Sequence, residues 1–331
     1  MKPWIWAVLL FAFACESTAQ NHAKELIGEI DSTLAARYYR NKGNIDTAYV
    51  MRPKTKWTIM GRLNVSGSNI KTDGKRDGVP FTSEMKAERK ATLSLGVSYL
   101  GLSLSASLNP AKLAGKYSDY ELSFMSYGKR FGFDITYQSA KNFTGSYSTG
   151  GQERVELPAD ILSLKTLNVN AFYVFNSRKF SYPAAFSQSY IQRRSAGSFL
   201  VALSAQGQLA DVTGDYAMKL KTSNIGVGAG YGYNFVPGRG WLLHLSALPT
   251  FIVYSYAKLS YYDTEVRMKY HFPEAIITGR GAAAYEWKNM FLSLSMIFNF
   301  TGIGHAETMS VQNTRWRVRA TYGLRLGKRK E

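Results

Sequence analysis

The sequence contains one cysteine, Cys15, and only four histidines in 331 residues. Structural disulfides are therefore excluded, and a metal site built from cysteine and histidine is not expected. We predict no cofactor. Lipidation of Cys15 is disfavoured because the preceding Ala12-Phe13-Ala14 lacks the usual leucine.

Long hydrophobic runs are also missing after the first twenty residues, where no stretch reaches the ~18 apolar residues of a membrane-spanning helix. The first residues, MKPWIWAVLLFAFACESTAQ, place Lys2 before an apolar run and end it with Ser17-Thr18-Ala19. This pattern predicts an export signal over residues 1–19, cleaved near Ala19.

Acidic residues are scarce, with 23 Asp and Glu against 41 Lys and Arg, which gives a net charge of +18. Strong basicity often indicates a nucleic-acid partner, but export excludes that class. An anionic membrane surface or an anionic solute is the expected counterpart. The basic segment 71–90 is interpreted as a solvated rim, with lipopolysaccharide phosphates as an alternative partner.

What the chain does contain is a polarity pattern of period two. In KWTIMGRLNVSG, Trp57, Ile59 and Leu63 alternate with polar residues, which indicates a β-strand because a helix would need a period of 3.6. The pattern recurs along the chain and predicts twelve strands. The predicted strands are 57–69, 90–98, 101–109, 119–127, 131–143, 163–175, 192–206, 222–235, 241–256, 274–287, 291–300 and 313–326.

The predicted connections alternate between short and long. The short ones lie at 99–101, 128–130, 236–240 and 288–290, and the long ones near 70–89, 110–118, 144–162, 207–221, 257–273 and 301–312. Only 176–191 breaks this rule. Short turns at one end and long loops at the other are typical of an outer-membrane barrel, with the short turns and both termini on the periplasmic side.

Aromatic residues beside the strand ends support the same interpretation, because aromatic rings collect at membrane interfaces. The predicted girdle at the short turns comprises Trp57, Tyr99, Tyr127, Phe131, Phe175, Phe235, Trp241, Trp287 and Phe291. A second girdle near the long loops comprises Tyr137, Phe143, Tyr254, Phe300 and Trp316.

The segment NIGVGAGYGYNF has glycine at four alternate positions, Gly226, Gly228, Gly230 and Gly232. Glycine weakens a strand interior, so one face of this strand has been left without side chains. If the apolar residues between them face lipid, the glycines face the lumen and leave room there. A soluble barrel would invert this arrangement, but it explains neither the girdle nor the loop asymmetry.

Residues 22–40 differ, because Leu26, Ile30, Leu34 and Tyr38 recur every four residues and predict an amphipathic helix. This helix could pack under the barrel mouth, plug the lumen or bind a partner. The predicted organisation is therefore a signal at 1–19, a periplasmic helix and linker at 20–55, and an all-β antiparallel transmembrane barrel at 56–331.

Several segments resemble an uncharacterised family of Bacteroidetes proteins that look like outer-membrane barrels. The similarity is carried by NIDTAYVMRPKTKW (44–57), VFNSRKFSYPAAFSQSYIQRRSAGSFL (174–200), GAGYGYNFVPGRGWLLHLSALPTF (228–251) and NTRWRVRATYGLRL (313–326). The resemblance implies a barrel and supplies neither an activity nor catalytic residues. Unlike many barrels, this chain does not end in an aromatic residue, the usual signal for the barrel-assembly machinery.

Strand parity predicts which side chains face the lumen. The predicted set is Arg62, Asn64, Glu121, Asp134, Asn168, Asn170, Gln206, His244, Arg280, Glu286, Arg315, Arg317, Arg319 and Arg325. Its charged members other than Glu286 are the candidate lumen and binding residues. Stacked guanidinium groups repel each other, so they imply carboxylate partners in a salt-bridge network, a wet lumen, or an anionic ligand.

His244 and Ser246 share one face of a strand, as a base and its nucleophile require, and Glu286 is the predicted third member. Lipid-hydrolysing outer-membrane barrels have such a His-x-Ser pair, but theirs faces lipid and is followed by Asn, whereas Ala247 follows here. A structural contact is the simpler interpretation. The sequence therefore favours a non-enzymatic outer-membrane barrel in a Gram-negative bacterium. Its role would be that of a narrow channel or binding barrel for a small, anionic solute, or that of a structural barrel. A lipid hydrolase is the alternative.

Overall fold

The computed structural model describes residues 28–29, 32–33, 36, 45–76, 78–99, 102–108, 120–141, 143–157, 161–214, 217–261, 264–268, 274–305 and 309–328. The predicted export signal lies outside these residues. Within the predicted helix at 22–40, the described residues 28–29, 32–33 and 36 are helical. The chain forms two compact units, Met1–Ile45 and Asp46–Glu331. In the described part of the chain, no helix has both the length and the apolar character needed to cross a membrane.

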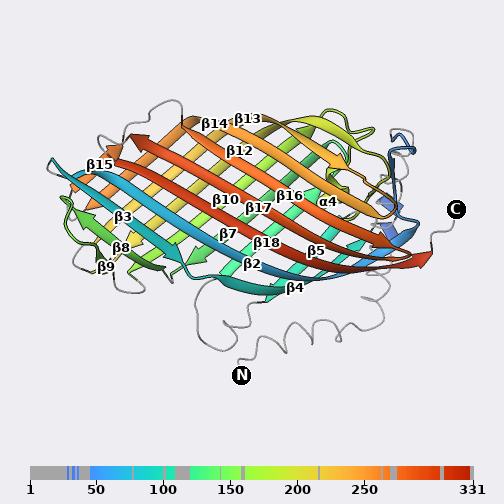
Figure 1. Cartoon of the computed structure of the whole chain (residues 1–331), viewed down its shortest axis with the longest axis horizontal. Coiled ribbons are helices and arrows are strands. Elements are labelled where there is room, and N and C mark those ends of the chain that lie inside the picture. The colour runs from blue at the N-terminus through green and yellow to red at the C-terminus, as the bar shows by residue number, and fades with distance from the viewer. Residues whose placement is uncertain are drawn as a thin grey trace, which may run out of the picture. The chain divides into compact units, whose positions relative to one another are not determined.

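The second unit is an antiparallel β-barrel, and each of the twelve predicted strands is present in it. The strands are β2 (Thr55–Arg76), β4 (Lys90–Tyr99), β5 (Leu102–Leu108), β6 (Tyr120–Tyr127), β7 (Phe131–Ala140), β10 (Leu162–Val174), β12 (Ala196–Val212), β13 (Met218–Phe235), β14 (Trp241–Tyr261), β16 (Ala275–Trp287), β17 (Met290–His305) and β18 (Met309–Lys328). Their order in the sheet is β6-β7-β10-β12-β13-β14-β16-β17-β18-β2-β4-β5. The outermost strands of this path, β5 and β6, contact each other, so the sheet curls into a barrel (Figure 1).

The end opposite the short turns is built differently from the prediction. Most of the residues expected in long loops extend the strands, as in β2, β12, β13, β14, β17 and β18, or form the additional strands β3 (Val79–Ala87), β8 (Phe143–Thr149), β9 (Val155–Leu157) and β15 (Thr264–Met268). The predicted loop 110–118 lies outside the described residues. The prediction was wrong because polar residues on both faces resemble a loop, whereas backbone hydrogen bonds to neighbouring strands hold these segments extended.

The wall at this end is completed by β3 and β8. The second half of β2 pairs with β3 instead of β4, and β3 pairs in turn with β8, which follows β7 after two residues. This pairing continues the wall beyond the short strands β5 and β6.

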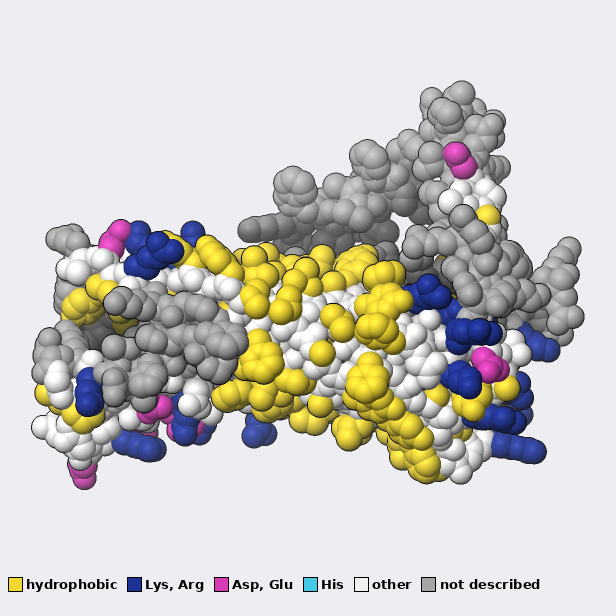
Figure 2. Space-filling view, turned by 90° about the horizontal axis from the view of Figure 1, so that it is seen from above, with side chains coloured by type: hydrophobic (Ala, Val, Ile, Leu, Met, Phe, Trp, Pro, Cys, Tyr) yellow, Lys and Arg dark blue, Asp and Glu magenta, His cyan; other side chains and the backbone are white. Residues whose placement is uncertain are grey.

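The two faces of the barrel wall follow the predicted parity. Leu95, Phe199 and Leu245 point outward and are 72%, 69% and 74% exposed, whereas Arg62 and Asn64 point inward and are buried. On the face seen in Figure 2, the outward apolar side chains form a band across the middle of the barrel, with Lys and Arg gathered towards both ends.

The aromatic girdles are confirmed in part. Outward-facing and exposed rings at the short-turn end are Trp57, Phe131, Phe175, Phe235 and Trp241, and Tyr254 is exposed at the other end. Tyr127 and Phe143 are instead buried in apolar clusters inside the barrel, and Phe291 is buried with the Arg325 guanidinium 5.1 Å from its ring centre.

The four alternate glycines of β13 face the lumen, as predicted, and the structure shows what occupies the space. A Cβ atom at Gly228 or Gly230 would collide with backbone carbonyls of β14, those of Pro249 and Ala247 respectively. A Cβ at Gly232 would lie 3.2 Å from the ring of Phe180, which reaches into the barrel. The glycines therefore permit close approach of β14 and of an internal segment.

Replacement of Gly230 by Ala should destabilise the barrel, because the new methyl group would collide with the Ala247 carbonyl oxygen. Overpacking of this kind costs about 1 to 3 kcal/mol. The midpoint of urea unfolding in lipid vesicles measures the change. Gly279→Ala on β16 is the control, because a Cβ there meets no atom within 4 Å. Equal unfolding midpoints for the two variants would contradict this account.

Candidate functional site

The connection between β10 and β12, residues 176–195, folds into the barrel at its short-turn end, and we call it the plug. Its centre is the short helix α4 (Tyr182–Phe186), which begins at the N-cap Ser181 with Pro183 in its first turn. The Ser181 hydroxyl accepts a hydrogen bond from the Ala184 amide at 3.2 Å. Serine at the cap and proline in the first turn are strong helix-start signals, so this local sequence encodes the helix.

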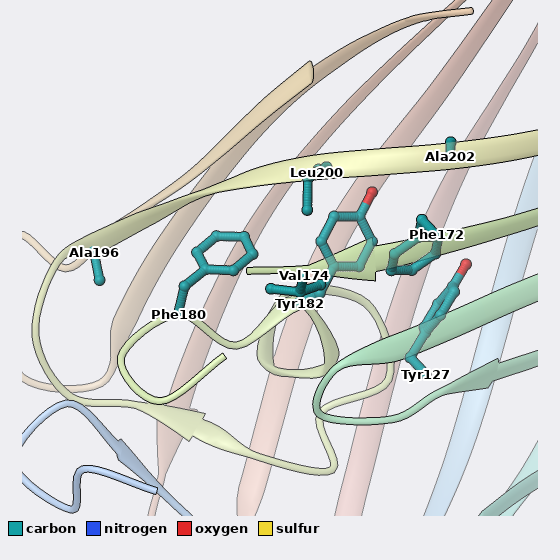
Figure 3. Close-up of a cluster of buried hydrophobic side chains, with 8 residues drawn as sticks. All are labelled: Tyr127, Phe172, Val174, Phe180, Tyr182, Ala196, Leu200 and Ala202. Atoms are coloured by element: carbon teal, nitrogen blue, oxygen red, sulfur yellow. The ribbon is translucent and has the colours of Figure 1, made fainter. Parts of the chain in front are cut away.

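The helix α4 bridges the lumen between two walls of the barrel. On one side, Ala184 and Ala185 pack against Leu242 of β14 and Ala284 of β16. On the other side, the Tyr182 ring lies 4.7 Å from that of Phe172 on β10. Figure 3 shows Phe180 and Tyr182 of the plug beside Phe172 and Leu200 of the wall. The plug therefore fills the lumen at this level.

A second contact joins the plug to the segment that precedes β2. The two-residue strands β1 (Val50–Met51) and β11 (Ile191–Gln192) pair in antiparallel fashion. The Arg193 amide donates to the Tyr49 carbonyl at 2.7 Å, and the Lys179 ammonium lies 5.0 Å from the centre of the Tyr49 ring. Part of the predicted linker 20–55 thus packs against the plug.

The Gln192 carboxamide joins the two halves of the plug. Its Nε2 donates to the backbone carbonyls of Lys179 at 2.6 Å and Arg194 at 2.9 Å. Because carbonyls only accept, the opposite atom of the carboxamide is the oxygen. That oxygen accepts from the Ser181 amide and from Asn234 Nδ2 on β13, both at 2.9 Å.

Asn234 continues this network into the barrel wall. Its Nδ2 also donates to the Ser181 carbonyl at 2.9 Å, so its Oδ1 faces His244, 2.7 Å from Nδ1. His244 Nε2 lies 3.0 Å from Ser246 Oγ. Asn234, His244 and Ser246 are 0%, 3% and 5% exposed.

The predicted third member of the His-Ser pair, Glu286, does not reach His244. In the register of β14 and β16, His244 lies opposite Ala282, and Glu286 lies four residues beyond, about 13 Å along the strand. Glu286 instead forms an ion pair with Arg325, whose Nη2 donates to the Gln188 carbonyl of the plug at 3.2 Å. Asn234, which the sequence analysis missed as a partner of His244, lies directly opposite it across the hairpin turn.

Above the plug, the middle of the barrel holds a polar cavity of about 80 Å³. Its lining includes Arg280, Arg315, Arg317, Asn168, Asn170 and Gln206. This volume holds several water molecules.

Charged side chains of the cavity bond both to a carboxylate and to a carboxamide. Arg280 pairs with Asp134 at 2.9 Å, and Asp134 also accepts from Asn170 at 2.8 Å. Arg315, in contrast, donates to the neutral amide oxygen of Asn168 at 2.8 Å. The cavity therefore combines positive charge with carboxamide groups.

Other predicted lumen residues do not line this cavity. Arg319 donates to Asn64 Oδ1 at 2.7 Å, and the buried Arg62 donates to the Met60 sulfur at 3.3 Å. The backbone of Glu121 is part of β6, and its side chain lies outside the described part of the chain. Among the described residues, no cluster of His, Cys, Asp and Glu is suited to hold a metal ion.

The free space narrows towards the plug. A cavity of only about 10 Å³ lies between Phe186 of the plug and the inward side chains Arg317 and Arg319. This is room for at most one water molecule.

Replacement of Gln192 by Ala should release the plug. The change removes an acceptor from Ser181 and Asn234 and a donor from two carbonyls, and each buried group left without a partner costs about 1 to 3 kcal/mol. Local opening should rise at least tenfold, measured as trypsin cleavage after the basic residues of segment 176–195 in otherwise folded protein.

Gln208→Ala is the matched control, because Gln208 is a partly buried glutamine of β12 whose Nε2 makes no hydrogen bond within the described residues. Equal cleavage of the two variants would show that Gln192 does not hold the plug.

The short-turn end carries a cluster of cations around Lys129. Burial is the main cause that lowers the pKa of Lys129 to about 8, and the charges of Arg130, Arg178 and Arg52 lower it further. The pKa is lower than in the unfolded chain, so the folded protein binds fewer protons and its stability rises as pH increases between about 8 and 10.5.

Acetylation of Lys129 should therefore follow a titration with its midpoint near pH 8, measured by peptide mass spectrometry. Arg130→Gln should move the midpoint upward, because it removes a neighbouring positive charge. A midpoint near the ordinary lysine value of 10.5 in the native protein would contradict the burial of this amine.

Comparison with known proteins gives one family match and only distant structural similarity. A family model described as a domain of unknown function, DUF4421, matches residues 44–326. No curated protein matches the sequence.

Among solved structures, the outer-membrane protease OmpT from Escherichia coli is 8% identical with a TM-score of 0.46, covering 83% of this chain and 98% of that one. The outer-membrane protein OprG from Pseudomonas aeruginosa is 12% identical with a TM-score of 0.27, covering 82% and 96%. The β domain of the Bordetella autotransporter BrkA is 9% identical with a TM-score of 0.34, covering 80% and 99%. Similarity at this level assigns no function to the chain.

Proposed function

The chain belongs to the family described as a domain of unknown function, DUF4421, and we propose that it is an outer-membrane barrel whose lumen binds small anionic solutes. The membrane location is supported by the outward apolar band, which includes Leu95, Phe199 and Leu245. Apolar side chains that are exposed around a whole barrel are costly in water and favourable in lipid. The predicted export signal at 1–19 supports a location in the envelope of a Gram-negative bacterium.

The observation that carries the solute function is the composition of the central cavity. Arg280, Arg315 and Arg317 line it together with carboxamides, whereas the described carboxylate in its lining is Asp134. Guanidinium groups bind carboxylates and phosphates through paired hydrogen bonds, and carboxamides supply donors and acceptors for the neutral part of a solute. The site therefore suits a small anion with additional polar groups.

The plug makes free diffusion through this barrel unfavourable. The bridging helix α4 and the narrow space beside Phe186 close the short-turn end, which we place on the periplasmic side. A solute would enter from the long-loop side, bind at the arginines and pass only when the plug moves. A channel of this kind is closed at rest.

The lipid-hydrolase alternative is weakened by geometry. Ser246 lies inside the barrel, 5% exposed and covered by the plug, whereas a lipid substrate would have to reach it from the outer face. Contacts with outer-membrane lipid, with lipopolysaccharide at the basic rim and with the barrel-assembly machinery stay predictions.

Planar-bilayer recording of the refolded chain tests the proposed function. The native protein should conduct little, and Gln192→Ala should produce discrete conductance steps that favour anions, as shown by the reversal potential in a salt gradient. Adding Arg317→Glu to Gln192→Ala should shift the reversal potential towards cations, because it inverts a charge at the cavity.

The matched control is Lys165→Glu in the same background, which makes the same charge change at an exposed side chain of β10. A silent Gln192→Ala protein would favour a purely structural barrel. Equal selectivity of the two charge variants would overturn the role of the lumen arginines.

A further inference from the structure

The side chains of Asn234, His244 and Ser246 form a chain of hydrogen bonds with a defined direction. Asn234 presents its oxygen to His244 because its nitrogen already donates to the Ser181 carbonyl and to Gln192. His244 therefore carries its proton on Nδ1, and Nε2 keeps the lone pair. The Ser246 hydroxyl, 3.0 Å away, donates to Nε2.

This direction is the one that acyl-transfer chemistry requires. A serine becomes a nucleophile when an imidazole nitrogen with a free lone pair accepts its proton, and a third group holds the imidazole in the correct tautomer. Here Ser246 is the nucleophile, His244 the base and Asn234 the positioning residue.

A charged donor also lies beside the serine. Arg280 is the direct cross-strand neighbour of Ser246, and both side chains point inward and are buried. Arg280 Nη2 bonds Asp134, whereas its Nη1 is buried and makes no hydrogen bond within the described part of the chain. A buried, preorganised donor next to a nucleophile is suited to stabilise an oxyanion.

The central cavity supplies the route to this group. Arg280 and Asp134 line the cavity, so a solute bound there would lie one strand away from Ser246. The hydroxyl of Tyr182 lies 3.5 Å from Ser246 Oγ and separates it from the lumen. Movement of the plug would therefore expose the serine.

We propose that Ser246 is the nucleophile of an esterase site that acts on small, soluble, anionic esters inside the barrel. The ester's negative group would bind at the lumen arginines, so the substrate class rests on the proposed function, whereas the reactivity of Ser246 does not. In a lipid hydrolase the substrate reaches the serine from the outer, lipid-facing side of the barrel, whereas here it would come from the lumen.

The reaction uses only these groups and water. Ser246 Oγ forms a bond to the ester carbonyl carbon while its proton passes to His244 Nε2, and Arg280 Nη1 donates to the resulting oxyanion. The bond to the alcohol oxygen then breaks, and the alcohol leaves with the proton from Nε2. Water, deprotonated by Nε2, attacks the acyl-serine, which releases the carboxylic acid and restores the Ser246 hydroxyl.

Covalent labelling of the refolded full chain with diisopropyl fluorophosphate tests this proposal. The reagent phosphorylates an activated serine as fluoride leaves, and peptide mass spectrometry locates the adduct. We expect one adduct on Ser246, none in Ser246→Ala, and labelling about a hundredfold slower in His244→Gln, because general-base catalysis contributes at least that factor. Tyr182→Ala should label faster than the native chain, because it uncovers the serine.

Ser293→Ala is the control, because Ser293 is an inward serine of β17 that is 6% exposed, similar to Ser246. It should label like the native protein. Absence of an adduct in both native and Tyr182→Ala protein, with cooperative thermal unfolding of both, would overturn the proposal, as would an unchanged adduct in Ser246→Ala. The bilayer recording is independent of this labelling. If the channel showed no anion selectivity while Ser246 was still labelled, only the binding of anionic substrates at the lumen arginines would be overturned.

Discussion

The arrangement of side chains inside this barrel depends on the hydrogen bonds of the Gln192 carboxamide. Two backbone carbonyls fix its nitrogen, and this fixes in turn the orientation of Asn234 and the tautomer of His244. All of these groups are buried, so a wrong orientation would leave several donors and acceptors without partners. The plug, the wall and the serine are thereby coupled into one polar network.

The architecture could be predicted from the sequence because the same alternation of apolar and polar residues recurs in each strand. Period-two polarity identified the twelve strands β2, β4–β7, β10, β12–β14 and β16–β18 but not the additional strands β3, β8, β9 and β15, and parity placed Arg280, Asp134 and the glycines of β13 on the correct face. Each of these inferences uses only the geometry of a single strand. The lengths of the strands beyond the apolar band were underestimated, because pairing there comes from neighbours that a single strand does not reveal.

The candidate site was harder to predict because it depends on the pairing register between neighbouring strands and on the contacts of the connection 176–195. His244 and Ser246 could be found as neighbours on one face, but choosing Glu286 as their partner required the register between two strands, and that choice was wrong. Asn234 could have been found from the hairpin at 236–240, where it lies opposite His244. The role of segment 176–195 could not, because its contacts include β6, β14 and β16, which are distant from it in sequence.

The position of the plug within the chain also constrains how the barrel forms. The last strand, β18, pairs with the first long strand, β2, along its length, from Met309 opposite Gly74 to Lys328 opposite Thr55. Contacts between residues so far apart in sequence carry a large loop-closure entropy and are expected to form late. The plug belongs to the middle of the chain, between β10 and β12, so its aromatic contacts with them are local and can precede that closure. The ring of strands is therefore expected to wrap around a plug that is already folded, and no finished barrel needs to open to receive it.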